Sequence, residues 1–162
     1  MRIIPALAPL ALLAACNQSG PAPSPSEQET AASPAPAPDD SISRDAMAVA
    51  GQWQAAMEAR DWAKVRGFWG DHGHASGLTP AQFAEAWGVL KTVTVKFGKG
   101  IADAGAGSLT FELPVQIVGV REDGLAYRTE GILSWRRVND VPGATPEQLR
   151  WHIERSTLAP SS

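Results

Sequence analysis

The sequence predicts one α+β domain in which three N-terminal helices pack on a curved antiparallel sheet of about four strands. Between residues 45 and 90, apolar side chains recur every three or four positions, as on one face of a helix. From residue 92 onward they recur at every second position, as in a half-buried strand. A run of helices followed by a run of strands favours an α+β fold over a parallel α/β sheet.

The first two predicted helices meet at an Arg-Asp pair. Residues 45–60 form the first, and either Ser43 or Asp45 is a favourable N-cap for it. Asp61 is in turn a favourable N-cap for a short second helix, which Gly70 ends at the latest. The side chains that these two helices turn toward the core are Met47, Ala50, Trp53, Met57, Val65, Phe68 and Trp69.

The third predicted helix begins with a recognisable start signal. Thr79, Pro80 and Gln82 match a capping box with proline at the first helical position. The helix then extends toward Leu90 with Phe83 and Trp87 on one face. The three helices together account for the chain up to the point where the spacing of apolar residues changes.

Four strands are predicted after the helices. They cover residues 92–97, 109–121, 125–137 and 149–158, with a Gly-rich connection after the first and a Pro-containing turn before the last. A loop with Gly124 in a left-handed bulge joins the second and third strands as a hairpin. That hairpin would pair Phe111 with Trp135, Leu113 with Leu133 and Gly119 with Tyr127.

The chain starts with a segment built like a secretory signal. Residues 1–15 hold a positive start, an apolar run too short for a membrane-spanning helix, and small residues at the end. Leu13-Ala14-Ala15-Cys16 resembles the lipobox of bacterial lipoproteins. This resemblance implies cleavage before Cys16 and acylation of its thiol with palmitate-type chains, which anchor a protein stably when two or more are attached. The alternatives for the lone cysteine are a buried free thiol and a secreted thiol that awaits a partner.

The lipobox resemblance also implies a cellular location. In the family, Asp after the cysteine retains the protein in the inner membrane, and this chain has Asn17 there. We therefore expect a lipid anchor in the outer membrane, with the domain facing the periplasm or the cell surface. Residues 16–42, rich in Pro, Ala and Ser, are predicted to be a disordered tether for a domain at 43–159.

The charge of the domain excludes one class of partner. The whole chain has a net charge of −3, but from Arg44 onward 13 basic residues balance 13 acidic ones. The acidic excess belongs to the tether, in Glu27, Glu29, Asp39 and Asp40. A neutral domain without a basic run lacks the positive surface that nucleic-acid binding requires.

The order of elements and the junction of the first two helices, "WQAAMEARDWAKVRGFW", resemble the NTF2-like cone fold of the SnoaL and ketosteroid-isomerase type. The resemblance implies a pocket between the concave face of the sheet and the helices. In enzymes of this family a carboxylate or histidine lies in the pocket, opposite Tyr or acidic donors. We expect the corresponding residues here on the inward faces of the strands.

Alternation along the strands assigns side chains to two faces. The inward set supplies the expected ligand-binding residues, which are Tyr127, Thr129, Trp135, Trp151 and Ile153, with Leu125, Leu133 and Leu149 beside them and Arg155 and Thr157 near the rim. The outward set is charged and is expected to form cross-strand ion pairs in solvent, through Arg128, Glu130, Arg136, His152 and Glu154. The predicted pocket is therefore apolar, with two polar donors.

No catalytic residue, metal ligand or cofactor is predicted. Glu112 would point into the pocket as a base only if Pro114 made a bulge in its strand. Asp71, His72 and His74 are ligand types for zinc or copper, but no third strong ligand lies at motif spacing, so a solvated loop is expected. The six tryptophans are predicted to be core residues, with Trp135 and Trp151 lining the pocket.

These observations favour a membrane-anchored envelope lipoprotein whose non-catalytic NTF2-like domain binds a small apolar ligand or a protein partner of the envelope. One alternative is a small isomerase or hydratase that uses the same pocket, and another is a structural component of an envelope assembly. An inward carboxylate near Tyr127 would favour the enzyme.

Overall fold

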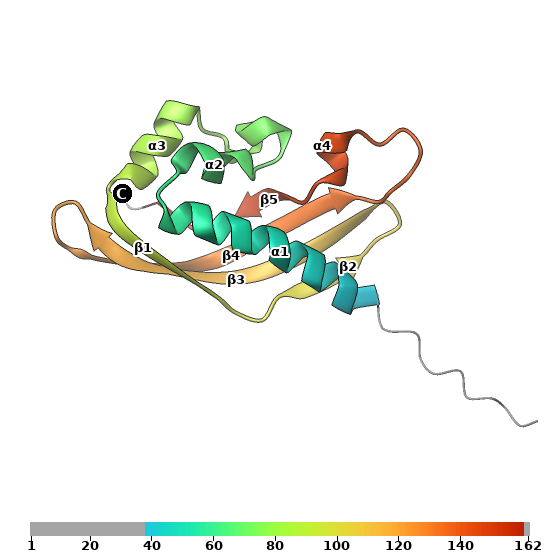
Figure 1. Ribbon diagram of the computed structural model, residues 1–162, viewed down its shortest axis with the longest axis horizontal. Coiled ribbons are helices and arrows are strands. Elements are labelled where there is room, and N and C mark those ends of the chain that lie inside the picture. The colour runs from blue at the N-terminus through green and yellow to red at the C-terminus, as the bar shows by residue number, and fades with distance from the viewer. Residues whose placement is uncertain (1–37, 161–162) are drawn as a thin grey trace, which may run out of the picture. The chain divides into compact units, whose positions relative to one another are not determined.

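The computed structural model describes residues 38–160, which form helices packed over an antiparallel sheet (Figure 1). Cys16, the predicted signal at 1–15 and the predicted tether up to residue 37 lie outside the described residues. Within residues 38–160, no helix combines the length and apolar composition that a membrane span needs.

Five helical segments precede or interrupt the strands. They are α1 (Pro38–Glu58), α2 (Trp62–Gly67), the 3-10 helix η1 (Asp71–Ser76), α3 (Pro80–Gly88) and α4 (Pro146–Leu149). Helix α1 begins at Pro38, upstream of the boundary predicted at residue 43, and Ile42 extends its buried face in that direction. Proline is tolerated there because the first turn of a helix needs no N–H donor.

The predicted caps of α2 and α3 are confirmed. The Asp61 carboxylate accepts a hydrogen bond from the Lys64 N–H at 3.0 Å. Thr79 and Gln82 form a complete capping box, with Pro80 at the first helical position. Both helices therefore start where their sequence signals place them, and α2 ends at Gly67, before Gly70.

The sheet contains β1 (Leu90–Phe97), β2 (Ile101–Ala104), β3 (Ser108–Arg121), β4 (Ala126–Val138) and β5 (His152–Ser156). The strand order is β1-β3-β4-β5, and β2 pairs with β3 beyond the end of β1. The hairpin register is confirmed at all three predicted pairs, Phe111–Trp135, Leu113–Leu133 and Gly119–Tyr127. Strand β2 was not predicted, because it is a four-residue piece within the Gly-rich connection.

Pro114 causes no bulge in β3. Pairing with β4 passes through Pro114 and Ile132 without a register shift. The proline is tolerated because its missing N–H would point toward the gap between β1 and β2, where Gly98 N–H donates to the Pro114 carbonyl at 2.8 Å. Glu112 therefore stays on the outer face, 3.9 Å from the Arg155 guanidinium.

A register shift in β5 corrects the predicted faces of its last residues. Trp135 pairs with Ile153, but Ser134 pairs with Arg155, so Glu154 is an extra residue in the strand. The shift turns Arg155 and Thr157 to the outer face, whereas the sequence placed them on the inner rim. Leu125, also predicted to face inward, lies in the β3–β4 turn with 63% of its surface exposed.

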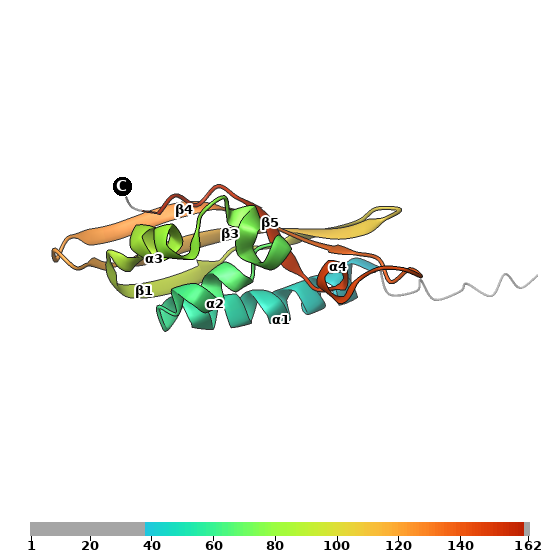
Figure 2. The ribbon, with the colours of Figure 1, turned by 90° about the horizontal axis from the view of Figure 1, so that it is seen from above.

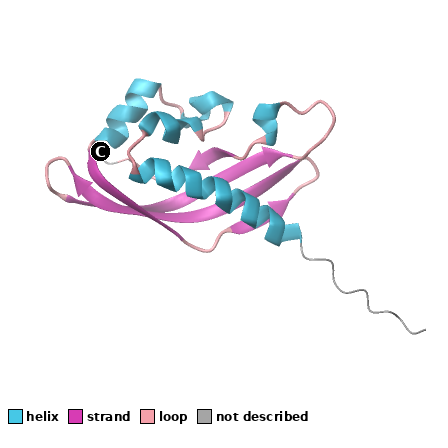
Figure 3. Cartoon of the chain, viewed as in Figure 1, coloured by secondary structure: helices cyan, strands magenta, loops and turns pink. Residues whose placement is uncertain are grey.

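The core lies between the inner face of the sheet and the helices, which gather on one side of it (Figures 2 and 3). Its largest fully buried side chains are Trp135, Phe111, Met57, Leu90, Leu113, Ile117, Leu133, Ile153 and Val65. The outer face has the expected cross-strand ion pair between Arg136 of β4 and Glu154 of β5, whereas Arg128 pairs with Glu130 within β4.

Candidate functional site

The space between helices and sheet contains a small, largely enclosed pocket of about 170 Å³. The indoles of Trp53, Trp69 and Trp87 line it, and Ser76 and Ser156 are its polar side chains. None of its lining residues is an acid, a histidine or a basic residue. Ligand pockets usually have volumes of roughly 300 to 1,000 Å³. This internal pocket is thus too small for most organic ligands and carries no general base.

The five predicted ligand-binding residues do not line a common cavity. The Tyr127 hydroxyl donates to the Ala159 carbonyl at 2.9 Å, and its pKa is raised because partial burial disfavours the phenolate, against a smaller lowering by Thr129. Trp135 is fully buried, and Phe68 packs edge-on against it at 6.2 Å. Ile153 lines the internal pocket.

Trp151 lines a different and larger depression, which we name the α1–α4 groove. It is open to solvent and has a volume of about 750 Å³. Its lining residues come from α1, α2, η1 and the segment from α4 to β5, and are Val49, Gln52, Lys64, Gly67, Phe68, His72, Glu147, Leu149, Arg150 and Trp151. Apolar side chains of the helices and of the α4–β5 segment therefore meet in this groove, together with charged side chains.

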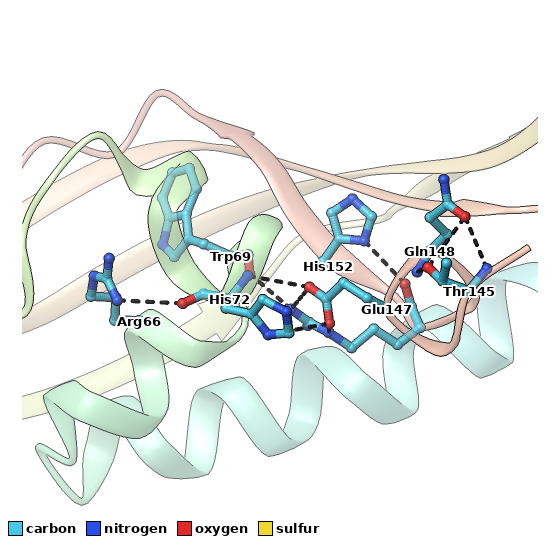
Figure 4. Close-up of polar contacts among 8 residues, drawn as sticks. Arg66, Trp69, His72, Thr145, Glu147, Gln148 and His152 are labelled. Carbon is cyan, nitrogen blue, oxygen red and sulfur yellow. Dashed lines mark hydrogen bonds and ion pairs between the residues drawn. The ribbon is translucent and has the colours of Figure 1, made fainter.

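Glu147 connects α4 to η1 at the groove (Figure 4). Its carboxylate accepts two hydrogen bonds from Arg150, at 2.6 and 2.7 Å, and one from the backbone N–H of His72 at 3.3 Å. The His72 Nδ1 lies 3.9 Å from the same carboxylate, and Arg150 also donates to the Trp69 carbonyl at 2.9 Å. We call this arrangement of Glu147, Arg150 and His72 the Glu147 latch.

The latch changes the acidity of its carboxyl group. The pKa of Glu147 is lowered to about 2, mainly by the hydrogen bonds from Arg150. Partial burial acts in the opposite direction, and the hydrogen bond from the His72 N–H adds to the lowering. Glu147 is therefore a carboxylate at neutral pH and a weak base. Its role in the groove is to hold α4 against η1.

The loop on the η1 side of the latch has an unusual backbone. Asp71 and His72 have φ values of 52° and 51°, a region that residues other than glycine rarely adopt. The buried Arg66 supports this conformation by donating to the carbonyls of Leu78, at 3.0 Å, and His72, at 3.4 Å. A side chain at Gly73 would collide with the Arg66 guanidinium, at 2.7 Å. Conformations of this kind cost about 1 to 3 kcal/mol and are concentrated near functional sites.

The histidine loop does not form a metal cluster in the described residues. His72 faces Glu147, while Asp71 and His74 are exposed. No group of three or more His, Cys, Asp or Glu side chains that could hold a metal ion occurs within residues 38–160. His152, expected on the outer face, is half-buried, with Nδ1 3.1 Å from the Arg150 carbonyl.

Sequence reasoning missed Lys64, Glu147 and Arg150 as site residues. A signal for α4 was present, because Thr145-Pro146-Glu147-Gln148 repeats the pattern of Thr79-Pro80-Ala81-Gln82, and both form capping boxes. The stretch was interpreted as a turn because its helix is only four residues long.

Comparison with known proteins identifies the fold. No protein-family model and no curated protein matches the chain. An NTF2-like superfamily protein from Salmonella enterica is similar in structure, with a TM-score of 0.51, 11% identity, and coverage of 76% of this chain and 94% of its own. The domain has the NTF2-like fold.

Two further structures are similar to this NTF2-like domain. The Kfla4162 protein from Kribbella flavida has a TM-score of 0.51 and 10% identity, covering 76% of this chain and 93% of its own. A candidate dehydratase of the NTF2-like family from Streptomyces avermitilis has a TM-score of 0.51 and 10% identity, covering 75% and 97%. At such identities the likeness concerns the fold alone, so the function of the NTF2-like domain must be argued from its own cavities.

Proposed function

We propose that the chain is an envelope lipoprotein, anchored through Cys16 to the outer membrane, whose NTF2-like domain binds a small ligand in the α1–α4 groove without catalysing a reaction. The anchor is supported by the lipobox-like Leu13-Ala14-Ala15-Cys16 at the end of an apolar run. The binding role is supported by the contrast between the two cavities of the domain.

That contrast is the observation on which the proposal depends. The core side chains leave an internal pocket of about 170 Å³, whereas the groove offers about 750 Å³ with apolar side chains in its lining. A concave, mainly apolar surface with a few polar groups is the usual form of a small-molecule site. The groove has this form, with Val49, Phe68, Leu149 and Trp151 as its apolar part.

The polar groups of the groove fit binding better than proton transfer. A general base works best with a pKa near the operating pH. Among the described residues, the only carboxylate that lines the groove is that of Glu147, whose pKa of about 2 and two hydrogen bonds from Arg150 make it a poor base. An isomerase or hydratase would need a different proton acceptor.

A fluorescent probe tests the position of the site. N-phenyl-1-naphthylamine is uncharged and apolar, and its fluorescence rises when it leaves water. We expect the full chain to bind it, and Gln52→Trp, at an exposed position that lines the groove, to weaken binding by narrowing the groove.

The matched control is Leu78→Phe, which enlarges a side chain lining the internal pocket. This variant should bind the probe like the parent chain, and thermal melts should show that both variants are folded. Loss of binding in Leu78→Phe with retention in Gln52→Trp would contradict the proposal and place the site inside the fold.

A further inference from the structure

We infer that the ligand of the α1–α4 groove is an anionic amphiphile, with an apolar body against Phe68 and Trp151 and a single anionic head group at Lys64. The inference rests on the proposed function, since it names the ligand class of the same site. It follows from the pairing of the charged side chains in the groove, which leaves one of them without an acidic partner.

Four titratable side chains line the groove, namely Lys64, His72, Glu147 and Arg150. Arg150 donates hydrogen bonds to the Glu147 carboxylate and to the Trp69 carbonyl, and His72 faces the Glu147 carboxylate. Lys64 is exposed, and within residues 38–160 no acidic side chain lies within ion-pair distance of its ammonium group. With neutral histidine, the groove therefore has a formal charge of +1, located on α2.

The acidic residue nearest in sequence to Lys64, Asp61, already accepts a backbone hydrogen bond. The Asp61 carboxylate caps α2 by accepting the backbone N–H of Lys64 at 3.0 Å. This bond keeps the carboxylate at the start of the helix, so the ammonium group of Lys64 is left for a ligand. An ammonium group on a flexible stem serves as a compact point charge for an anionic head group.

The floor of the groove suits the apolar body of such a ligand. Trp151 is 6% exposed, and its indole Nε1 is buried without a hydrogen-bond partner among the described residues. Phe68 and Leu149 are half-buried and complete the apolar surface on either side. Such a surface gains from the burial of an apolar chain, and this favours an amphiphile over a sugar or a peptide of polar residues.

Three probes that carry an eight-carbon chain and different head groups test the inference. Octanoate, 1-octanol and octyltrimethylammonium share this nominal chain length and differ in charge, so calorimetric titration of the full chain compares the three head groups. We expect octanoate to bind tightest, roughly two- to fivefold more tightly than octanol, as for an exposed ion pair, and octyltrimethylammonium to bind weakest. The preference should shrink as salt is added.

Variants assign the preference to Lys64. Lys64→Gln should remove the advantage of octanoate over octanol and leave octanol binding unchanged, while Lys64→Arg should retain the advantage. Lys99→Gln, an exposed lysine outside the groove, is the matched control and should behave like the parent chain.

The outcomes separate this inference from the proposed function. If N-phenyl-1-naphthylamine binds in the groove but octanoate binds no more tightly than octanol, or Lys64→Gln keeps the preference, the anionic ligand class is wrong and the groove remains a binding site. If neither that probe nor any octyl compound binds in the groove, both proposals are wrong.

Discussion

At the scale of single residues, Glu147 determines how the groove is assembled. The residue comes from a short helix late in the chain, and its carboxylate reaches the backbone of a loop 75 positions earlier in sequence. Arg150 completes the arrangement three positions later by donating to both Glu147 and the Trp69 carbonyl. The two walls of the groove are thus held together by hydrogen bonds to one carboxylate.

The acidity of Glu147 yields a pH prediction. Its pKa is lowered from 4.5 to about 2 in the folded protein, so its contribution to stability is complete above about pH 4.5 and is lost as the pH falls through about 2. NMR titration of the side-chain carboxyl carbon should give a midpoint near 2. In Arg150→Gln, the midpoint should move back toward the ordinary value. A midpoint near 4.5 in the parent chain would show that the latch does not form.

At the scale of secondary-structure elements, α1 protects the free edge of the sheet. Strand β1 ends the strand order, and its outer edge would otherwise present unpaired backbone groups. The Glu58 carboxylate accepts the Val95 N–H at 3.0 Å, the Gln54 amide donates to the Val95 carbonyl at 3.1 Å, and Arg60 donates to the Leu90 carbonyl at 3.1 Å. Side chains of α1 and the residues after it thus take the place of a neighbouring strand.

Removing this protection should cost stability and expose the edge. We expect Glu58→Ala to lower the free energy of unfolding by about 0.5 to 1.5 kcal/mol, the net value of a typical hydrogen bond, and to promote concentration-dependent association. Glu58→Gln keeps an acceptor oxygen and should retain most of both properties. Urea unfolding and sedimentation velocity measure the two effects, and equal behaviour of Glu58→Ala and the parent chain would contradict the role given to α1.

Local sequence signals predicted the elements that depend on local chemistry. The caps at Asp61 and Thr79 and the register that pairs Phe111 with Trp135 follow from residues close in sequence or from strict alternation. Strand β2 and the extra residue at Glu154 were missed, because a short strand and a single inserted residue leave no periodic signal.

The candidate site was harder to predict than the fold. Of the five residues expected to bind a ligand, only Trp151 lines the groove. Lys64 and Glu147 are far apart in sequence and come together only when α4 folds back over the helices, which alternation along a strand cannot indicate. Trp135 and Ile153 face inward as predicted, but both are fully buried, and of the two only Ile153 lines a cavity, the small internal pocket.

At the scale of the whole molecule, the domain has an NTF2-like fold in which the core between helices and sheet leaves a pocket of about 170 Å³, while the α1–α4 groove has about 750 Å³. The groove forms where residues 146–151 return alongside α1 and η1. The groove between α1, α2, η1 and the α4–β5 segment is open to solvent, so a ligand can enter it without any opening of the core.

The proposed anchor gives a prediction at the same scale. Cys16→Ser should move the protein from the membrane fraction to the soluble fraction without changing the melt of the domain, because acyl chains on the thiol supply the membrane affinity. Asn17→Asp is the matched variant, and it should stay membrane-bound but shift toward the inner membrane. A Ser variant that still sediments with membranes would show that Cys16 is not the anchor.

The position of the binding site can be measured most directly by mapping backbone amide shifts during an octanoate titration. We expect saturable shifts at Val49, Lys64 and Leu149 around the α1–α4 groove, with little change at residues of the internal pocket such as Phe83 and Leu158. Saturable shifts centred on Phe83 and Leu158, with Val49 and Leu149 unchanged, would contradict binding in the groove and place the site in the interior of the fold.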